Sequence, residues 1–359
     1  MKRSFPNESK IFLMLLFFLL LISILGQYSA FGGLWDEQVL RHIVRIFIGI
    51  ALATCIFFID FRFWNNYAYM FYAFALISLL IANLAGITRL GAQRWIDLYF
   101  FAFQPSEFMK LATIFALARY YSILSSAETM RLKDHISPIF FVLLPALLIF
   151  KQPDLGTAVL IVCTGAGIIF LAGFPQKAFA AIIGLCFLLC PVGWFFLHDY
   201  QKNRILTFVD PYRDPLGAGY HILQSKIAIG SGRLWGRGFL HGTQSKLNFL
   251  PEKNTDFIFT TIAEEFGFAG SIAVLFLFIF ICYYFFWAAS VSRNKFTKLL
   301  CYGLGMLLFL HVFVNVAMVV GLLPVVGIPL PFLSYGGSSM TTFMISCGLL
   351  MSSFKQKRF

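Results

Sequence analysis

The stretch from Leu299 to Phe354 contains no Asp, Glu, Lys or Arg, and no other feature constrains the fold as strongly. A helix of about 20 apolar residues already spans a bilayer, so this stretch is too long for a core helix of a soluble protein. Over the whole chain, 59% of residues are hydrophobic and 12% are charged, which is too little charge to cover a soluble surface. The sequence therefore predicts an all-α polytopic membrane protein.

Apolar segments separated by charged or turn-forming residues predict about ten transmembrane helices. We place them at 11–31, 43–60, 67–86, 105–124, 136–151, 155–173, 178–197, 266–289, 299–321 and 339–354. Most Lys and Arg residues of the short loops face the cytoplasm if both termini are cytoplasmic, as the positive-inside rule requires. We therefore expect one membrane domain over residues 1–359, in the inner membrane of a bacterial cell.

One basic segment, residues 198–255, falls outside the membrane in this topology. Long loops are translocated regardless of their charge, so this loop does not contradict the predicted orientation. Apolar and polar residues mix over Tyr220–Ile229, which predicts a short amphipathic helix at the outer interface. The glycines of 230–238 then permit tight turns. Topology thus explains the net charge of +12, which in a soluble protein could indicate a nucleic-acid partner.

The seven cysteines do not indicate a disulfide or a metal site. Their number is odd, they lie in apolar segments, and no Cys-x-x-Cys spacing occurs. Small buried side chains are the simplest interpretation.

Ionisable residues inside predicted spans are costly and therefore indicate function. Glu107 and Lys110 lie three residues apart at the start of the fourth predicted span, on one face of the helix. They could form a structural ion pair or line a polar cavity for a charged substrate. Asp154 follows Pro153 between the fifth and sixth spans, where it could cap a helix or reach the same outer region.

Asp256 precedes an apolar stretch that is already long enough to cross the membrane from Phe266 onward. The residues before Phe266 therefore extend the eighth span outward or form a half-helix bent near Gly267 or Gly270. Either arrangement places Asp256 at the outer mouth of the bundle, although it or Thr255 could simply cap the helix. Glu264 and Glu265 are about 100° apart on a helix, so at most one of them shares the face of Asp256.

The link Gly321–Ser338 separates two apolar spans and contains three prolines, which exclude a continuous helix. Irregular backbone at membrane depth is tolerated where protein or a cavity surrounds it. Ser334, Gly336 and Gly337 could hold an anion through hydroxyl and main-chain N–H groups, or the link could be an ordinary outer loop. All of these features fall on the predicted outer side, beside the basic loop. Together they suit a membrane-embedded lipid diphosphate.

At these residues the chain resembles the SEDS family (shape, elongation, division, sporulation) of peptidoglycan glycosyltransferases. The resemblance covers nearly the whole chain and rests on several short motifs in a fixed order. These are 91–95 (GAQRW), 104–107 (QPSE) with Lys110, 152–157 (QPDLGT), 210–215 (DPYRDP), 242–244 (GTQ) with 247–252 (LNFLPE), 255–259 (TDFIF) with 263–265 (AEE), and 327–338 (GIPLPFLSYGGS). The amino-acid sequence of residues 248–256 looks more like the elongation branch, RodA, than the division branch, FtsW.

The resemblance implies a ten-span fold, Asp256 as the essential catalytic residue, and a central cavity lined by Glu107, Lys110 and Asp154. The other motif residues expected to bind substrate are Arg94, Gln152, Thr157, Ser334, Gly336 and Gly337. Asn254 departs from the pattern, because relatives often carry His there. The implied partners are lipid II, a class B penicillin-binding protein that crosslinks the glycan, and the elongation complex. No cofactor is certain.

The implied reaction polymerises lipid II into β-1,4 glycan strands for cell elongation and rod shape. A sugar hydroxyl attacks the donor's anomeric carbon with inversion, and a carboxylate, Asp256, serves as general base. Lys110, Arg94, loop arginines or a divalent cation (Mg²⁺ or Mn²⁺) would neutralise the leaving diphosphate. Two alternatives remain open: a flippase for the lipid-linked precursor, which also suits intramembrane charge and a broken link, and a scaffold for the transpeptidase.

Overall fold

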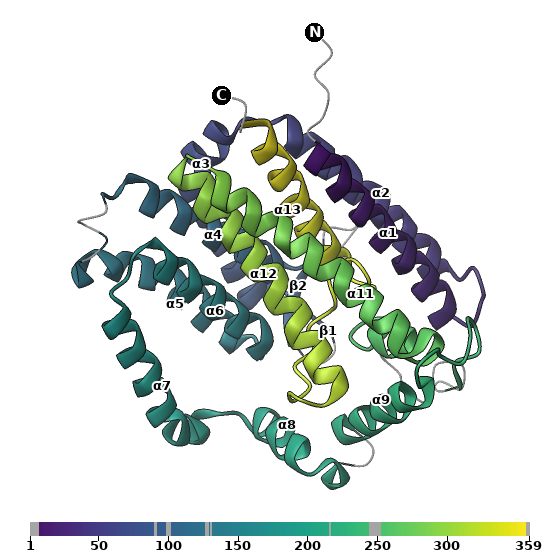
Figure 1. Cartoon of the computed structure of the whole chain (residues 1–359). Coiled ribbons are helices and arrows are strands. Elements are labelled where there is room, and N and C mark those ends of the chain that lie inside the picture. The colour runs from purple at the N-terminus through teal and green to yellow at the C-terminus, as the bar shows by residue number, and fades with distance from the viewer. Residues whose placement is uncertain are drawn as a thin grey trace. The chain divides into compact units, whose positions relative to one another are not determined.

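Figure 1 shows the computed structural model of the chain. It describes residues 7–89, 92–97, 102–125, 129, 131–214, 217–243 and 253–356. The predicted motif segment 247–252 and residues Gly91, Pro215 and Gln244 lie outside this description.

Each of the ten predicted spans falls on a helix of the described part of the chain. The helices are α1 (Asn7–Ala30), α2 (Glu37–Phe58), α3 (Phe61–Ala85), α4 (Pro105–Ile123), α5 (Ile136–Lys151), α6 (Leu155–Ala172), α7 (Gln176–Phe196), α11 (Ile258–Val291), α12 (Lys295–Val320) and α13 (Gly337–Gln356). Seven described helices are long and apolar enough to cross a membrane by length and composition. Helices α4, α7 and α13 supply the other three predicted spans. The prediction of an all-α polytopic membrane protein is confirmed.

The outer loop contains further helical structure: α8 (Asp199–Val209), the 3₁₀ helix η3 (Pro211–Arg213) and α9 (Ala218–Gly232). Helix α9 includes the amphipathic helix predicted at Tyr220–Ile229. A second 3₁₀ helix, η2 (Leu132–His135), precedes α5.

The chain forms two compact units. The first comprises Met1–Ile48, Cys186–Ile281 and His311–Met340, and the second comprises Gly49–Leu185, Cys282–Leu310 and Thr341–Phe359. The single membrane domain predicted over 1–359 stays a prediction.

Helices α3, α4, α5 and α6 pack against one another in the second unit. Glycines bring helices close there: a Cβ on Gly303 of α12 would lie 2.5 Å from Ile114 and 2.7 Å from Ile168. Small residues at such positions permit close helix packing where the lipid supplies no hydrophobic driving force.

The second unit also contains a three-stranded antiparallel sheet that the sequence did not predict. Its strands are β1 (Ile87–Arg89), β2 (Ala92–Asp97) and β3 (Ala102–Phe103), in the order β1-β2-β3. The strands are too short to produce a recognisable alternation of polar and apolar residues. The sheet matters for the site because β2 carries Arg94.

Helix α11 is kinked at Gly267, which is one of the two glycines where the sequence predicts a possible bend. Gly267 has φ +65°, and a Cβ there would lie 2.3 Å from the nitrogen of Gly236. The kink leaves carbonyls of the preceding turn without helical partners. The N–H groups of Arg237 and Gly238 donate to the carbonyls of Glu264 and Glu265 at 3.0 Å each. The glycine-rich turns after α9 therefore stabilise the bend.

Candidate active site

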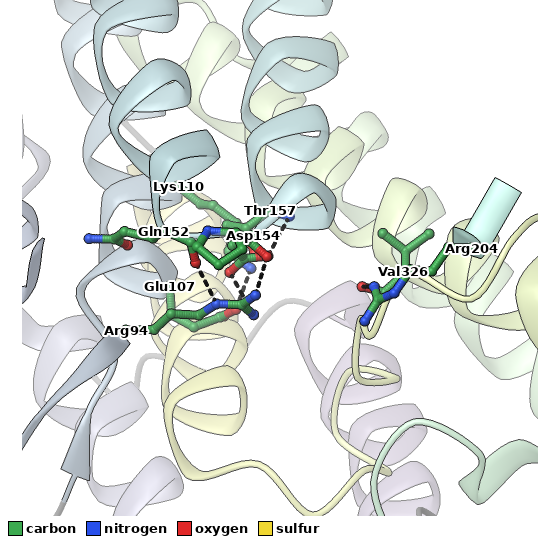
Figure 2. A network of polar contacts seen from close by, with 9 residues as sticks. Arg94, Glu107, Lys110, Gln152, Asp154, Thr157, Arg204 and Val326 are labelled. Atoms are coloured by element: carbon green, nitrogen blue, oxygen red, sulfur yellow. Dashed lines mark hydrogen bonds and ion pairs between the residues drawn. The ribbon is translucent and has the colours of Figure 1, made fainter. Parts of the chain in front are cut away.

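Arg94 joins strand β2 to the turn between α5 and α6. Its Nε donates to the carbonyl of Gln152 at 2.9 Å, and its Nη2 donates to the carbonyl of Pro153. Its Nη1 lies 3.6 Å from Oδ2 of Asp154. Figure 2 shows Gln152 and Asp154 beside the guanidinium of Arg94. The arginine therefore fixes the turn and provides the positive partner of Asp154.

Asp154 also caps helix α6, which is one of the two roles predicted for it. Its Oδ1 accepts a hydrogen bond from the main-chain nitrogen of Thr157 at 3.2 Å. The Gln152 side chain donates to the carbonyl of Leu79 at 3.2 Å, which anchors the turn to the end of α3. Asp154 thus combines a structural cap with an ion pair to Arg94.

Glu107 and Lys110 form a buried ion pair in the first turns of α4. The Nζ of Lys110 lies 2.7 Å from Oε1 of Glu107, and the side chains are only 1% and 6% exposed, respectively. Pro105 begins the helix at a position where its missing N–H costs no hydrogen bond. The second oxygen of Glu107, Oε2, is buried, and no described residue forms a hydrogen bond with it. A sugar hydroxyl would satisfy this oxygen, since a buried acceptor without a donor is costly.

The second unit thus brings together six predicted site residues: Arg94, Glu107, Lys110, Gln152, Asp154 and Thr157 (Figure 2). We call these residues the charged cluster. It places two cations and two carboxylates at the ends of packed helices.

Asp256 lies in the first unit, in a turn of residues 253–257 that directly precedes α11. Its side chain is half-buried, and its Oδ2 lies 3.5 Å from where a Cβ on Gly327 would be. Gly327 has φ +79°, a backbone geometry that favours glycine. Burial lowers the pKa of the neighbouring Lys253.

Ser334, Gly336 and Gly337 lie in the same unit as Asp256. The Ser334 hydroxyl is already engaged, since it donates to the carbonyl of Thr255 at 2.6 Å and accepts from the nitrogen of Leu330 at 2.7 Å. The predicted anion binding therefore depends chiefly on Gly336 and Gly337, where α13 begins. The Nε of Arg45 lies 3.1 Å from where a Cβ on Gly337 would be, so an arginine adds its charge there.

Glu264 and Glu265 have different partners, as their angular separation predicted. Oε1 of Glu264 accepts from the hydroxyl of Thr243 at 3.1 Å, and Oε1 of Glu265 accepts from the hydroxyl of Ser29.

Two buried amides beside Asp256 were not predicted as site residues. Gln27 on α1 and Asn315 on α12 are both 0% exposed and contact the turn that carries Asp256. A polar side chain in an apolar span is the sequence signal that could have found them, because a buried amide needs hydrogen-bond partners.

Comparisons with known proteins agree with this fold. A family model described as a cell cycle protein, whose label joins FtsW, RodA and SpoVE, matches residues 8–358. The peptidoglycan glycosyltransferase MrdB of Escherichia coli K12 is 42% identical over 344 residues, which cover 95% of this chain and 91% of that protein.

Solved structures show the same architecture. A chain from a peptidoglycan synthase complex, studied for the coordination of polymerization and crosslinking, aligns with a TM-score of 0.85 and 26% identity over 99% of both chains. The rod shape determining protein RodA of Thermus thermophilus shares the fold with a TM-score of 0.74 and 24% identity, over 100% of this chain and 99% of that one.

The fold, the buried charges and these relatives together define a polytopic membrane glycosyltransferase of peptidoglycan synthesis. The chain belongs to the SEDS family, and its similarity to MrdB places it in the RodA branch.

Proposed function

We propose that this protein polymerises lipid II into β-1,4 glycan strands at the outer face of the bacterial inner membrane, for cell elongation and rod shape. Asp256 is the general base. The observation that carries this assignment is the position of Asp256: a half-buried carboxylate on a turn before α11, whose Oδ2 lies 3.5 Å from where a Cβ on Gly327 would be. A carboxylate in such a place can reach a substrate hydroxyl and keep a fixed geometry, which general-base catalysis requires.

The reaction is a single displacement. The acceptor's sugar hydroxyl attacks the anomeric carbon of the donor while Asp256 takes its proton. The bond between that carbon and the diphosphate oxygen breaks, and polyprenyl diphosphate leaves with the bonding electron pair. Attack from the opposite face converts an α donor into a β-1,4 link.

The charged cluster supplies binding for the charged and polar parts of lipid II. Arg94 and Lys110 provide positive charge for phosphate oxygens, and cations placed before reaction stabilise developing charge without reorganisation. The unpartnered Oε2 of Glu107 accepts a sugar hydroxyl. These charges are costly in a membrane protein unless a polar ligand uses them, which argues against a purely scaffolding protein.

A divalent cation, Mg²⁺ or Mn²⁺, would reach this site with the diphosphate. Mg²⁺ commonly binds through few carboxylates together with substrate phosphates. Among the described residues, no group of three or more His, Cys, Asp or Glu side chains could hold an ion by itself. The cation would add positive charge at the leaving group.

The proposed partners are a class B penicillin-binding protein and the elongation complex. Support comes from the structural neighbour, which is part of a peptidoglycan synthase complex. A transpeptidase at the same site would receive the new glycan directly.

Glycan synthesis by the purified protein tests this function. The protein would be reconstituted with lipid II, alone and with its class B partner, and the products separated by length. Polymer supports the transferase. Movement of labelled lipid II between leaflets without any polymer would instead establish the flippase alternative.

A further inference from the structure

The main chain that carries Asp256 is held by buried side chains at three successive carbonyls. The Nε2 of Gln27 donates to the carbonyl of Asn254 at 2.9 Å. The hydroxyl of Ser334 donates to the carbonyl of Thr255 at 2.6 Å. The third carbonyl is that of Asp256 itself, which accepts a bond at 2.9 Å from Nδ2 of Asn315.

Asn315 connects two segments rather than one. The same Nδ2 also donates to the carbonyl of Ile328 at 2.7 Å, in the link before α13. Gln27 also connects two segments, because its Nε2 donates to the carbonyl of Leu333 at 2.8 Å as well as to that of Asn254. Both amides therefore tie the turn 253–257 to the link 321–336. Asn315 does so at Asp256 itself.

Asn315 is not explained by the needs of its own helix. It is 0% exposed in the apolar helix α12, where an amide without hydrogen bonds would be strongly unfavourable. Both of its side-chain bonds go to carbonyls outside α12. Within the described part of the chain, the Oδ1 of Asn315 has no hydrogen-bond partner, so the bonds to the two segments come from its NH₂ group.

The bridge joins the two segments that meet at the carboxylate of Asp256. Asn315 holds the backbone of Asp256 and that of Ile328, and the residue before Ile328 is Gly327. Gly327 faces Oδ2 of Asp256 at 3.5 Å, measured to its would-be Cβ. A shift of either segment changes the position of the carboxylate relative to the sugar hydroxyl.

We propose that Asn315 is a positioning residue that fixes the Asp256 carboxylate against the Gly327 backbone during glycan polymerisation. This inference rests on the proposed function, in which Asp256 is the general base. A misplacement of about 1 Å can lower a rate about 100-fold, so loss of the bridge acts on the chemical step.

The test compares Asn315→Ala and Asn315→Ser with a matched control, Ser225→Ala. Ser225 is also 0% exposed and in the same unit, and its hydroxyl bridges α9 to the Val319 carbonyl at 2.7 Å and lies 3.0 Å from the Thr260 hydroxyl. It contacts neither the turn nor the link by these bonds. The full-length variants would be assayed for kcat, KM for lipid II, lipid II binding and thermal unfolding.

We expect Asn315→Ala to lower kcat by about 10- to 100-fold, with KM and lipid II binding changed less than about twofold. Asn315→Ser keeps one donor and should recover part of the loss. Ser225→Ala should keep kcat while its unfolding temperature falls at least as far as that of Asn315→Ala.

Equal effects of Asn315→Ala and Ser225→Ala on kcat, at equal unfolding temperature, would overturn the positioning role and leave the proposed function intact. Wild-type protein that makes no polymer would overturn both.

Discussion

Replacing Lys110 with Met would leave the Glu107 carboxylate buried without its partner. The two side chains are 2.7 Å apart and only 1% and 6% exposed, so solvent cannot replace the lost charge. Removing one member of a buried pair costs about 3–5 kcal/mol, whereas replacing both with neutral groups of similar volume is often close to neutral. The single variant Lys110→Met should therefore be destabilised by about that amount, and the double variant Glu107→Gln/Lys110→Met should recover most of it.

Stability and activity should separate in this experiment. Thermal and denaturant unfolding in detergent would measure stability, and polymer yield from lipid II would measure activity. The double variant should unfold near wild type yet remain inactive, because it has lost both charges offered to substrate. An exposed pair, Arg41 with Glu37, provides the control, and Arg41→Met should leave the unfolding temperature unchanged.

Two results would refute this reasoning. If the double variant were no more stable than Lys110→Met, the cost would not come from an unpaired buried charge. If the double variant polymerised lipid II normally, the pair would be only structural.

Three further predictions concern the turn before α6, the kink and the cation. Asp154→Asn keeps an N-cap but leaves the partly buried Arg94 without its ionic partner, so it should raise KM for lipid II and lower the free energy of unfolding. Asp154→Ala also removes the cap and should cost about 1 kcal/mol more, and equal stability of the two variants would contradict the cap. Gly267→Ala should lower the free energy of unfolding by at least about 1–3 kcal/mol, measured with denaturant, because Gly267 has φ +65° and the new Cβ would lie 2.3 Å from the Gly236 nitrogen. An unchanged free energy of unfolding would contradict this strain at Gly267. Chelation with EDTA should lower polymerisation, reversibly with Mg²⁺ or Mn²⁺, without lowering the unfolding temperature; a lower unfolding temperature would reveal an ion held by the protein.

The spans could be predicted from sequence because membrane helices carry a strong, local signal. Hydropathy and length located a helix for each of the ten. The excess length before Phe266 predicted either an outward extension or a half-helix bent near Gly267 or Gly270, and the structure has the bend at Gly267. The β-sheet escaped prediction because its strands β1, β2 and β3 are too short to show a regular alternation of polar and apolar residues.

The members of the charged cluster could all be predicted, but their pairing could not. Unexpected charge identified Glu107, Lys110 and Asp154, and the family resemblance added Arg94, Gln152 and Thr157. Sequence could not show that Arg94 pairs with Asp154, since a strand unseen in the sequence positions it.

Asn315 and Gln27 illustrate what sequence patterns miss. A single amide in an apolar helix gives no motif, and its role appears only when the fold brings it to the carbonyls of distant segments. The role of the Ser334 hydroxyl is likewise not visible in the sequence, because its two hydrogen bonds join the main chain of Leu330 to that of Thr255.

The most direct test of the central claim compares wild type with Asp256→Asn in polymerisation of lipid II at equal lipid II binding. Asn keeps the shape of the side chain but cannot accept the proton, so the rate should fall by about 100- to 10,000-fold while the fold and binding persist. An Asp256→Asn variant that polymerises lipid II near the wild-type rate would contradict the role of Asp256 as general base.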